Sequence, residues 1–523
     1  MPRVQKFLFL SLICVFCSNS SARAAGYSGE IKAIDANKRT ITIFVASLDD
    51  SKTLQIASSV SITIDEKPGT LKDIQPGYQA TATTTGDSVT RLRVRTKEIP
   101  KPTPRPKPES DPDPSPSPDS GTTATPSASN TEAAWPQILG PDRNGQSPET
   151  GLNWNWGSEG PKSLWYRSGL GEGFSSVAIA DGKVFTLGTE GTRESAFALN
   201  LSDGEPLWKL PFGSIFNDGT GNGPRGTPTI DGKLLYALGG NGDLACVSIE
   251  TGKGVWSKNI LRDFGGSNIT WGISESVLID GDRLICTPGG SRGTMVALNK
   301  KTGNVLWVSQ FPGNPQAAYS SAIAIEIDGV RQYVNMVHDR LIGVHAETGK
   351  LLWEDRKAVN GIANCSTPLQ FEDSVFYATG YNTGGSLVKL TSQNKSTTAE
   401  NVYHTREMKN HHGGMVIVGD YLYGCSDPGM LVCLDVATGK VEWQSRAPGK
   451  GSITYADGHL IVRNEQGPIT LVAANPDKYE QLAQFETPQQ FRSNRTKWSY
   501  PVVADRKLFL RDQDTLLVYD LSP

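Results

Sequence analysis

A glycine followed by a tryptophan at a fixed distance recurs along the last three quarters of the chain. Five times a Gly is followed four residues later by a Trp, in the pairs Gly204/Trp208, Gly252/Trp256, Gly303/Trp307, Gly349/Trp353 and Gly439/Trp443. The first four of these Trp residues are separated by 48, 51 and 46 residues. A repeat of this length predicts an array of similar units, each packed against its neighbours.

Each period has the sequence of about four short strands joined by tight turns. Asp-Gly and Thr-Gly supply the positive φ angles that such turns need, and alternating stretches such as Lys233–Leu238 lie between them. A four-stranded sheet cannot bury both faces alone, so the sheets are expected to stack radially as a β-propeller. The Trp residues expected to wedge between blades are Trp165, Trp208, Trp256, Trp307, Trp353 and Trp443.

The number of periods predicts eight blades. The last unit, which ends at Asp520, has only three strands, whereas Lys162–Tyr166 is a single strand that carries the repeat Trp. Pairing these two segments closes the ring and removes its free edges. The unit at 365–403 lacks a Trp at its end, so a seven-bladed ring in which it merges with a neighbour is the alternative.

The N-terminus has the features of an export signal. Arg3 and Lys6 precede an apolar run at Phe7–Phe16, and Ala22-Arg23-Ala24 is a small-residue cleavage site. We therefore expect residues 1–24 to be a signal peptide and the mature chain to be secreted or periplasmic. The apolar run is too short to span a bilayer, so no transmembrane segment is predicted.

Two segments separate the signal from the repeats. Residues 26–97 contain five or six short β-type stretches broken by Asn37-Lys38, Pro68-Gly69 and Pro76-Gly77, which predicts a small β-barrel domain. Residues 98–134 have Pro at alternate positions and then Ser, Thr and Ala, as in an extended, disordered linker. The propeller is expected to occupy residues 135–523.

Composition restricts the class of partner. The formal net charge is −3, and no clustered basic stretch suggests nucleic-acid binding. The 55 Gly and 32 Pro residues suit a turn-rich all-β protein, which we expect to be a monomer. Five cysteines follow the signal, and the sequence leaves open whether Cys425 and Cys433, on either side of a short turn, form a disulfide.

The Thr-Gly-Lys/Asn-x-x-Trp repeat resembles the pyrroloquinoline-quinone-type (PQQ-like) β-propeller repeat. This repeat is found in quinoprotein dehydrogenases and in non-enzymatic outer-membrane assembly propellers. Further segments resemble a bacterial secreted subfamily of unassigned activity, namely Trp135–Gly145, Gly169–Ser176, His411-His412-Gly413-Gly414 and Leu510–Asp514.

The resemblance implies two kinds of function. Quinoprotein alcohol dehydrogenases resemble one another in an adjacent Cys-Cys pair and in a Glu/Asn/Asp set that holds Ca²⁺. This sequence has neither adjacent cysteines nor the Cys-x-x-Cys-His of haem attachment. No cofactor is therefore expected, and a PQQ- and Ca²⁺-dependent alcohol or sugar dehydrogenase remains the alternative.

The sequence assigns no catalytic, cofactor or metal residue, but five residues are candidates for ligand contact. On a strand, His411 and His412 would point to opposite faces, whereas in a loop both could meet one ligand. Arg225, Lys497 and Arg511 are candidates to line the channel mouth and attract anions. The function that the sequence favours is a non-enzymatic binding or assembly scaffold that holds a protein or polymer partner at a propeller face. A hydrolase or lyase at the channel mouth is a further alternative.

Overall fold

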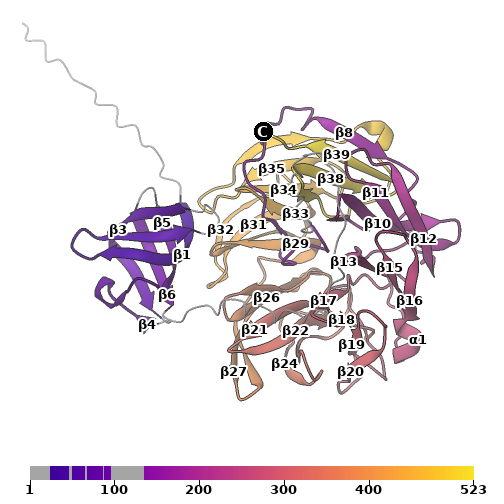
Figure 1. The fold of residues 1–523 in the computed structure, drawn as a ribbon, viewed down its shortest axis with the longest axis horizontal. Helices are drawn as coiled ribbons and strands as arrows, with labels where there is room; N and C mark the ends of the chain where they lie inside the picture. The colour runs from indigo at the N-terminus through magenta and orange to yellow at the C-terminus, as the bar shows by residue number, and fades with distance from the viewer. Residues whose placement is uncertain (1–23, 46–49, 65–66, 86–87, 96–134) are drawn as a thin grey trace, which may run out of the picture. The chain divides into compact units, whose positions relative to one another are not determined.

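The computed structural model describes residues 24–45, 50–64, 67–85, 88–95 and 135–523, which form two compact units (Figure 1). Apart from Ala24, the predicted export signal lies outside the described residues, and so does the predicted linker. Among the described residues, no helix has the length and apolarity needed to cross a membrane.

The first unit is one sheet whose pairings close into a ring. Its strands are β1 (Ala24–Asp35), β2 (Thr40–Val45), β3 (Asp50–Ile64), β4 (Lys67–Pro68), β5 (Gln79–Thr85) and β6 (Ser88–Arg95). They follow the order β2-β1-β5-β6-β3-β4, and β2 also pairs with β3, so five strands form a closed barrel to which β4 is attached. Alternate residues such as Ile41 and Ile43 fill its interior, and a 3-10 helix, η2 (Leu71–Asp73), lies before β5.

The second unit, within residues 135–523, contains eight sheets, numbered here in chain order, which are antiparallel except for the parallel pairing of β7 with β33 in sheet 7. Sheet 1 comprises β9 (Ala178–Ala180), β10 (Lys183–Glu190), β11 (Arg193–Asn200) and β12 (Pro206–Ser214). Sheet 2 comprises β13 (Thr229–Asp231), β14 (Leu234–Leu238), β15 (Asp243–Ser248) and β16 (Gly254–Asn259). Sheet 3 comprises β17 (Leu278–Asp280), β18 (Arg283–Cys286), β19 (Met295–Asn299) and β20 (Val305–Ser309). Sheet 4 comprises β21 (Ile323–Ile327), β22 (Val330–Val337), β23 (Arg340–His345) and β24 (Leu351–Asp355).

The remaining sheets follow the same order. Sheet 5 comprises β25 (Leu369–Phe371), β26 (Ser374–Thr379), β27 (Gly384–Gln393) and β28 (Ser396–Thr405). Sheet 6 comprises β29 (Asn410–Val418), β30 (Tyr421–Ser426), β31 (Met430–Asp435) and β32 (Val441–Ser445). Sheet 7 comprises β33 (Gly451–Ala456), β34 (His459–Asn464), β35 (Ile469–Ala473) and β36 (Gln481–Phe485), with β7 (Gln146–Ser147) added beside β33. Sheet 8 comprises β37 (Val502–Ala504), β38 (Lys507–Asp512), β39 (Thr515–Asp520) and β8 (Ser163–Arg167). Short helices at α1 (Ile260–Phe264) and η3 (Gln489–Phe491) complete the unit.

The predicted ring closure is confirmed. Strand β8, from the start of the unit, pairs antiparallel with β39 at its end, and Trp165 lies opposite Val518. The unit at 365–403 does not merge with a neighbour, because β25–β28 form a sheet of their own. The fold is therefore all-β and consistent with a PQQ-like propeller.

The repeat Trp residues join neighbouring sheets. In five of the six, the indole N–H donates to a backbone carbonyl of the next sheet or its turns, in the pairs Trp165–Leu201, Trp208–Ile249, Trp256–Lys300, Trp307–Ala346 and Trp443–Asn475, at 2.7–3.2 Å. Trp353 differs, since its N–H donates to the Gln332 side chain of its own sheet at 2.6 Å. Most of the repeat rings therefore bond and pack across the boundary between two sheets.

The requirement for Gly in the Thr-Gly turns is explained by an aromatic side chain of the preceding sheet. Gly349 has φ +70°, and a Cβ on it would lie 2.5 Å from Trp307. Gly303 is placed in the same way against Trp256. Only a residue without a side chain fits there, both for its backbone angle and for its contact. Each of these Gly residues thus lies against the aromatic ring of the preceding sheet, while the Trp four residues later belongs to its own sheet.

We expect the substitution Gly349→Ala to lower the free energy of unfolding by on the order of 2–5 kcal/mol, since left-handed strain adds to displacement of the Trp307 ring. Gly281→Ala is the matched control, because Gly281 has φ +58° and open space where the Cβ would lie. It should lose only about 1–2 kcal/mol, from strain alone. Urea unfolding monitored by circular dichroism measures both losses, and equal losses would contradict the packing role of Gly349.

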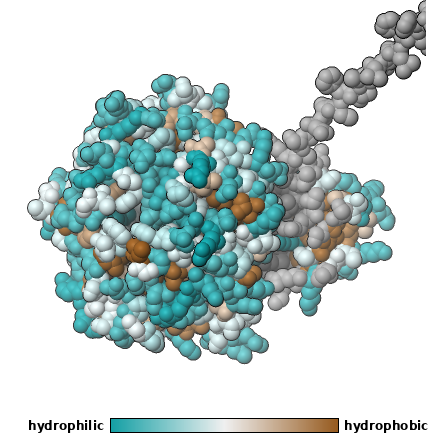
Figure 2. Space-filling model, turned by 180° about the vertical axis from the view of Figure 1, so that it is seen from behind, coloured by the Kyte–Doolittle hydropathy of each residue, from teal (hydrophilic) through white to brown (hydrophobic). Residues whose placement is uncertain are grey.

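Exposed apolar side chains lie mainly on outer strands of the second unit. Examples are Tyr166 on β8, Leu207 on β12 and Leu306 on β20. Figure 2 shows apolar groups on one face of this unit as small separate spots among hydrophilic residues. Scattered exposure of this kind is normal and does not by itself indicate a partner. The concave surfaces of the unit are better candidates for a functional site.

Candidate functional site

The loops that lead into the first strands of the sheets surround a cavity of about 300 Å³. Its lining comes mainly from the first strands of seven sheets or from the loops before them, and sheet 7 is the exception. Phe174 precedes β9, Arg225 precedes β13, Trp271 precedes β17 and Tyr319 precedes β21. A site assembled from so many separate sheets is held rigidly by the ring behind it.

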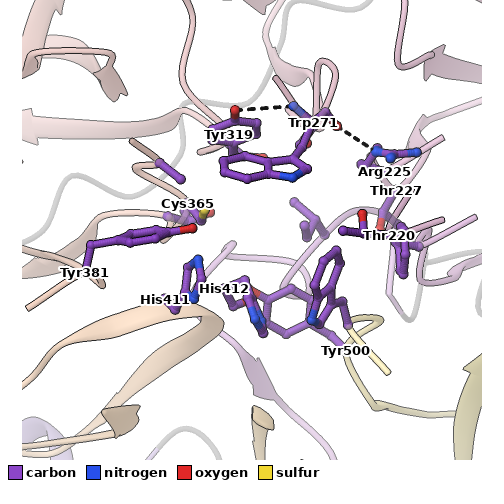
Figure 3. Close-up of a pocket in the computed structure, with 17 residues that line it drawn as sticks. Thr220, Arg225, Thr227, Trp271, Tyr319, Cys365, Tyr381, His411, His412 and Tyr500 are labelled. Carbon is purple, nitrogen blue, oxygen red and sulfur yellow. Dashed lines mark hydrogen bonds between the residues drawn. The ribbon is translucent and has the colours of Figure 1, made fainter. Parts of the chain in front are cut away.

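Aromatic rings form two sides of this cavity. Along one side, rings are in contact at centroid distances of 4.6–5.0 Å, in the order Tyr381, His411, His412, Trp498 and Phe174. Trp271 and Tyr319 lie on the other side with centroids 5.7 Å apart, and Figure 3 shows them across the cavity from the two histidines. The cavity is therefore suited to a group that packs against ring faces and edges.

The two consecutive histidines meet because β29 is irregular at its start. Its register against β30 shifts between Asn410 and Met415, so the intervening residues leave the regular ladder. The Asn410 side chain bonds the backbone of this bulge, donating to the Gly414 carbonyl at 2.8 Å. The predicted alternation of strand side chains does not apply within the bulge, and both imidazoles line the cavity.

His411 is a neutral imidazole at neutral pH. Burial lowers its pKa to about 4, and the nearby His412 and Lys450 act in the same direction. The Lys450 ammonium donates to His411 Nδ1 at 2.8 Å and lies 2.9 Å from Asp427 Oδ1. Because Nδ1 accepts this hydrogen bond, the ring proton is assigned to Nε2.

His412 contacts the carboxylate of Glu465. Its Nε2 contacts Glu465 Oε1, and the Trp498 indole N–H donates to the same oxygen at 3.1 Å. Burial by itself would raise the pKa of Glu465, but the hydrogen bond and charge of His412, with Lys450, hold it below its usual value. Glu465 is therefore a carboxylate at neutral pH.

Arg225 lies at the cavity but its guanidinium is already engaged. It donates to the carbonyls of Trp271 at 2.8 Å and Gly221 at 2.7 Å, and also to that of Gly223. It also lies over the ring of Phe216, 4.5 Å from the centroid. Arg225 thus braces the loop before β13 and leaves a positive charge beside the cavity.

The other two predicted cations lie apart from the cavity lining. Lys497 is 5% exposed, lies 3.2 Å from Asp512 Oδ2 and donates to the Ser493 carbonyl at 2.6 Å. Arg511 is 1% exposed and donates to the Gln513 carbonyl at 2.6 Å. The structure therefore places both as buried internal braces, because their donors are used within the fold.

The cysteines show no disulfide within the described residues. Cys425 lies opposite Leu431 and Cys433 lies opposite Tyr423, so they are not cross-strand partners. Cys365 lines the cavity, and burial raises the pKa of its thiol to about 12. It is therefore a protonated thiol and a poor nucleophile.

The cavity does not fit a calcium-dependent quinone. Ca²⁺ in proteins takes six to eight oxygen ligands, with carboxylates among them. The described residues that line the cavity include no Asp or Glu, and the nearby Asp427 and Glu465 are paired with Lys450 and His412. In the described part of the chain, no group of three His, Cys, Asp or Glu residues is arranged to hold a metal.

Sequence reasoning missed most of the aromatic lining. Trp271 and Trp498 lie outside the Thr-Gly-x-x-x-Trp positions, and neither is among the predicted wedge or ligand-contact residues. An available signal was the recurrence of an aromatic residue shortly before the first strand of a unit, as at Phe174, Trp271, Tyr319 and Trp498.

Comparisons with known proteins confirm the resemblance to PQQ-like propeller repeats. Residues 192–445 match the family described as "Outer membrane protein assembly factor BamB". The chain is 26% identical over 224 residues to a protein of that name from Shewanella oneidensis, covering 40% of this chain and 50% of that protein. It is also 26% identical over 260 residues to an uncharacterized protein of Rickettsia conorii, covering 48% of this chain and 59% of that protein. The chain thus spans only 50–59% of the length of these relatives.

Among solved structures, quinohemoprotein alcohol dehydrogenase from Comamonas testosteroni is similar in fold. The TM-score is 0.55 at 11% sequence identity, with 75% of this chain and 81% of that chain covered. Similarity at this level concerns the fold alone.

Proposed function

We propose that this PQQ-like repeat protein, whose repeats match those of an outer membrane protein assembly factor, is a non-enzymatic binding scaffold in an extracytoplasmic compartment. In this proposal the eight sheets are the blades of an eight-bladed propeller. The face that carries the aromatic cavity holds the partner, which we propose to be another protein.

The observation that supports a scaffold is the pairing of ionisable groups around the cavity. Lys450 is shared between His411 and Asp427, His412 is paired with Glu465, and Arg225 donates to three backbone carbonyls. Proton transfer needs a group that is free to gain or lose a proton at the working pH. These groups instead hold one another and the loops in place, which favours binding over chemistry.

Photocrosslinking in cells that export the full chain tests this proposal. p-Benzoylphenylalanine is placed at Tyr381 or Ile362, which are 39% and 51% exposed beside the cavity. The control positions are Val255 on β16 and Leu482 on β36, which are 51% and 45% exposed on outer strands. We expect a discrete adduct from the cavity positions and none from the controls.

Two results would contradict the scaffold. One is adduct formation from the outer strands alone, which would place the partner elsewhere. The other is a quinone absorbance band with stoichiometric Ca²⁺ in the purified protein, which would favour the dehydrogenase alternative.

A further inference from the structure

A second, polar pocket adjoins the aromatic cavity. It has a volume of about 180 Å³, and Tyr319 and Ala363 line both spaces. Its remaining lining includes Asn268, Gln316 and His338. The aromatic cavity (the chamber) and this polar pocket (the groove) are thus neighbours that share part of their lining.

The chamber is suited to a neutral ring. Aromatic walls accept either a cation or another ring, and aromatic pairs prefer tilted or edge-on contacts at about 4.5–7 Å. The Arg225 guanidinium lies 5.4 Å from the Phe174 centroid, and the Lys450 ammonium is bonded to His411, so a further cation would be repelled. No carboxylate is among the described lining residues, and the nearby Asp427 and Glu465 are already paired with Lys450 and His412, so a cationic ligand would lack a free counter-charge.

The polar groove is suited to a peptide backbone. The Gln316 amide offers both a donor and an acceptor, which match the carbonyl and N–H of a peptide unit, whereas the Asn268 amide already donates to the Gly240 carbonyl at 2.9 Å. Among the hydrogen bonds of the described residues, none uses the side chain of Gln316, which is exposed, or that of His338, which is half-buried. Both therefore remain available to a ligand next to the chamber.

We propose that the partner is a protein segment that inserts one aromatic side chain between the ring walls and lays its adjacent backbone along the Gln316 groove. This inference rests on the proposed scaffold function, and it names the chemistry of the partner. In protein interfaces, a few residues supply most of the binding free energy, and they are commonly aromatic side chains buried in a pocket.

Blocked pentapeptides test the proposal on the mature full chain. The peptides are Gly-Gly-X-Gly-Gly, acetylated and amidated, with Phe, Leu, Ala or Lys at X, and binding is measured by isothermal titration calorimetry. We expect the Phe peptide to bind at least tenfold more tightly than the other three. Equal binding of Phe and Leu, tighter binding of Lys, or no binding of Phe at millimolar concentration would each overturn the proposal.

Two variants separate the chamber from the groove. Tyr381→Ala removes a ring of the chamber, and we expect it to weaken both the Phe pentapeptide and the single residue N-acetyl-phenylalanine amide at least fivefold. Gln316→Ala should weaken the pentapeptide at least threefold and leave the single residue unchanged. Tyr166→Ala, an exposed Tyr on β8 outside the cavity lining, is the control and should change neither.

The peptide experiment tests the aromatic-anchor inference, and the crosslinking experiment tests the scaffold proposal. If adducts form at Tyr381 and Ile362 but the Phe peptide shows no preference, the aromatic-anchor inference is wrong and the scaffold stands. If neither experiment gives a signal, both are wrong.

Discussion

Deletion of residues 135–168 should abolish cooperative unfolding of the propeller and cause aggregation. The deletion removes β8, so the backbone groups of β39 lose their partners from Arg167 to Ser163. It also removes Trp165 from its place against the Gly204 turn of sheet 1. The unpaired edge of β39, next to the gap left by the Trp165 side chain, is a template for association with other chains.

Deletion of residues 26–130 is the control for this experiment. It removes the small barrel and the segment after it but leaves every strand of the eight sheets. We expect a monodisperse protein by size-exclusion chromatography and a single unfolding transition. A soluble, cooperatively melting protein after deletion of 135–168 would show that ring closure contributes little.

The second large effect is expected for Trp353→Ala, which should lower the free energy of unfolding by about 3–5 kcal/mol, the usual loss when a buried aromatic side chain is truncated. Trp353 is 5% exposed and packs in a cluster with Val375 and Tyr377 of sheet 5. Its loss also leaves the buried Gln332 side-chain carbonyl without its indole donor.

Two further substitutions calibrate this loss. Trp256→Ala should lose less, because the Trp256 ring is only partly buried. Val255→Ala, at a position 51% exposed on the same strand, should change stability by less than about 0.5 kcal/mol. Equilibrium urea unfolding gives all three values, and a loss under about 1 kcal/mol for Trp353→Ala would mean that the ring does not join two sheets.

The sequence was sufficient to predict the repeat and the closure of the ring. Glycine turns and Trp positions recur at a fixed spacing, and the two incomplete units at the ends of the repeat complement each other. The unit at 365–403 was harder to interpret because it lacks the Trp. In the structure, the Tyr403 hydroxyl donates to the Val436 carbonyl at 2.6 Å, and Gly439 lies against its ring. A different aromatic residue thus makes the same connection, which a search for Trp cannot detect.

The candidate site was predicted less completely. His411 and His412 were singled out as adjacent polar residues, and the bulge at the start of β29 brings both to the cavity. Glu465 and Lys450, which engage them, lie next to strands of sheet 7 and share no motif with them. Lys497 and Arg511 show the converse difficulty, because the burial of a single cation depends on distant carbonyls and carboxylates that no local pattern reports.

The pairing of β8 with β39 also determines when the propeller can be completed. Strand β8 is among the first parts of this unit to be synthesised, and β39 is the last strand of the unit. Sheets 1–7 can begin from local hairpins, whereas sheet 8 must wait for two segments far apart in sequence, a kind of contact that forms slowly. A chain terminated before Thr515 would leave β8 permanently unpaired. Completion of sheet 8 therefore requires that the segments of sheets 1–7 have already been synthesised.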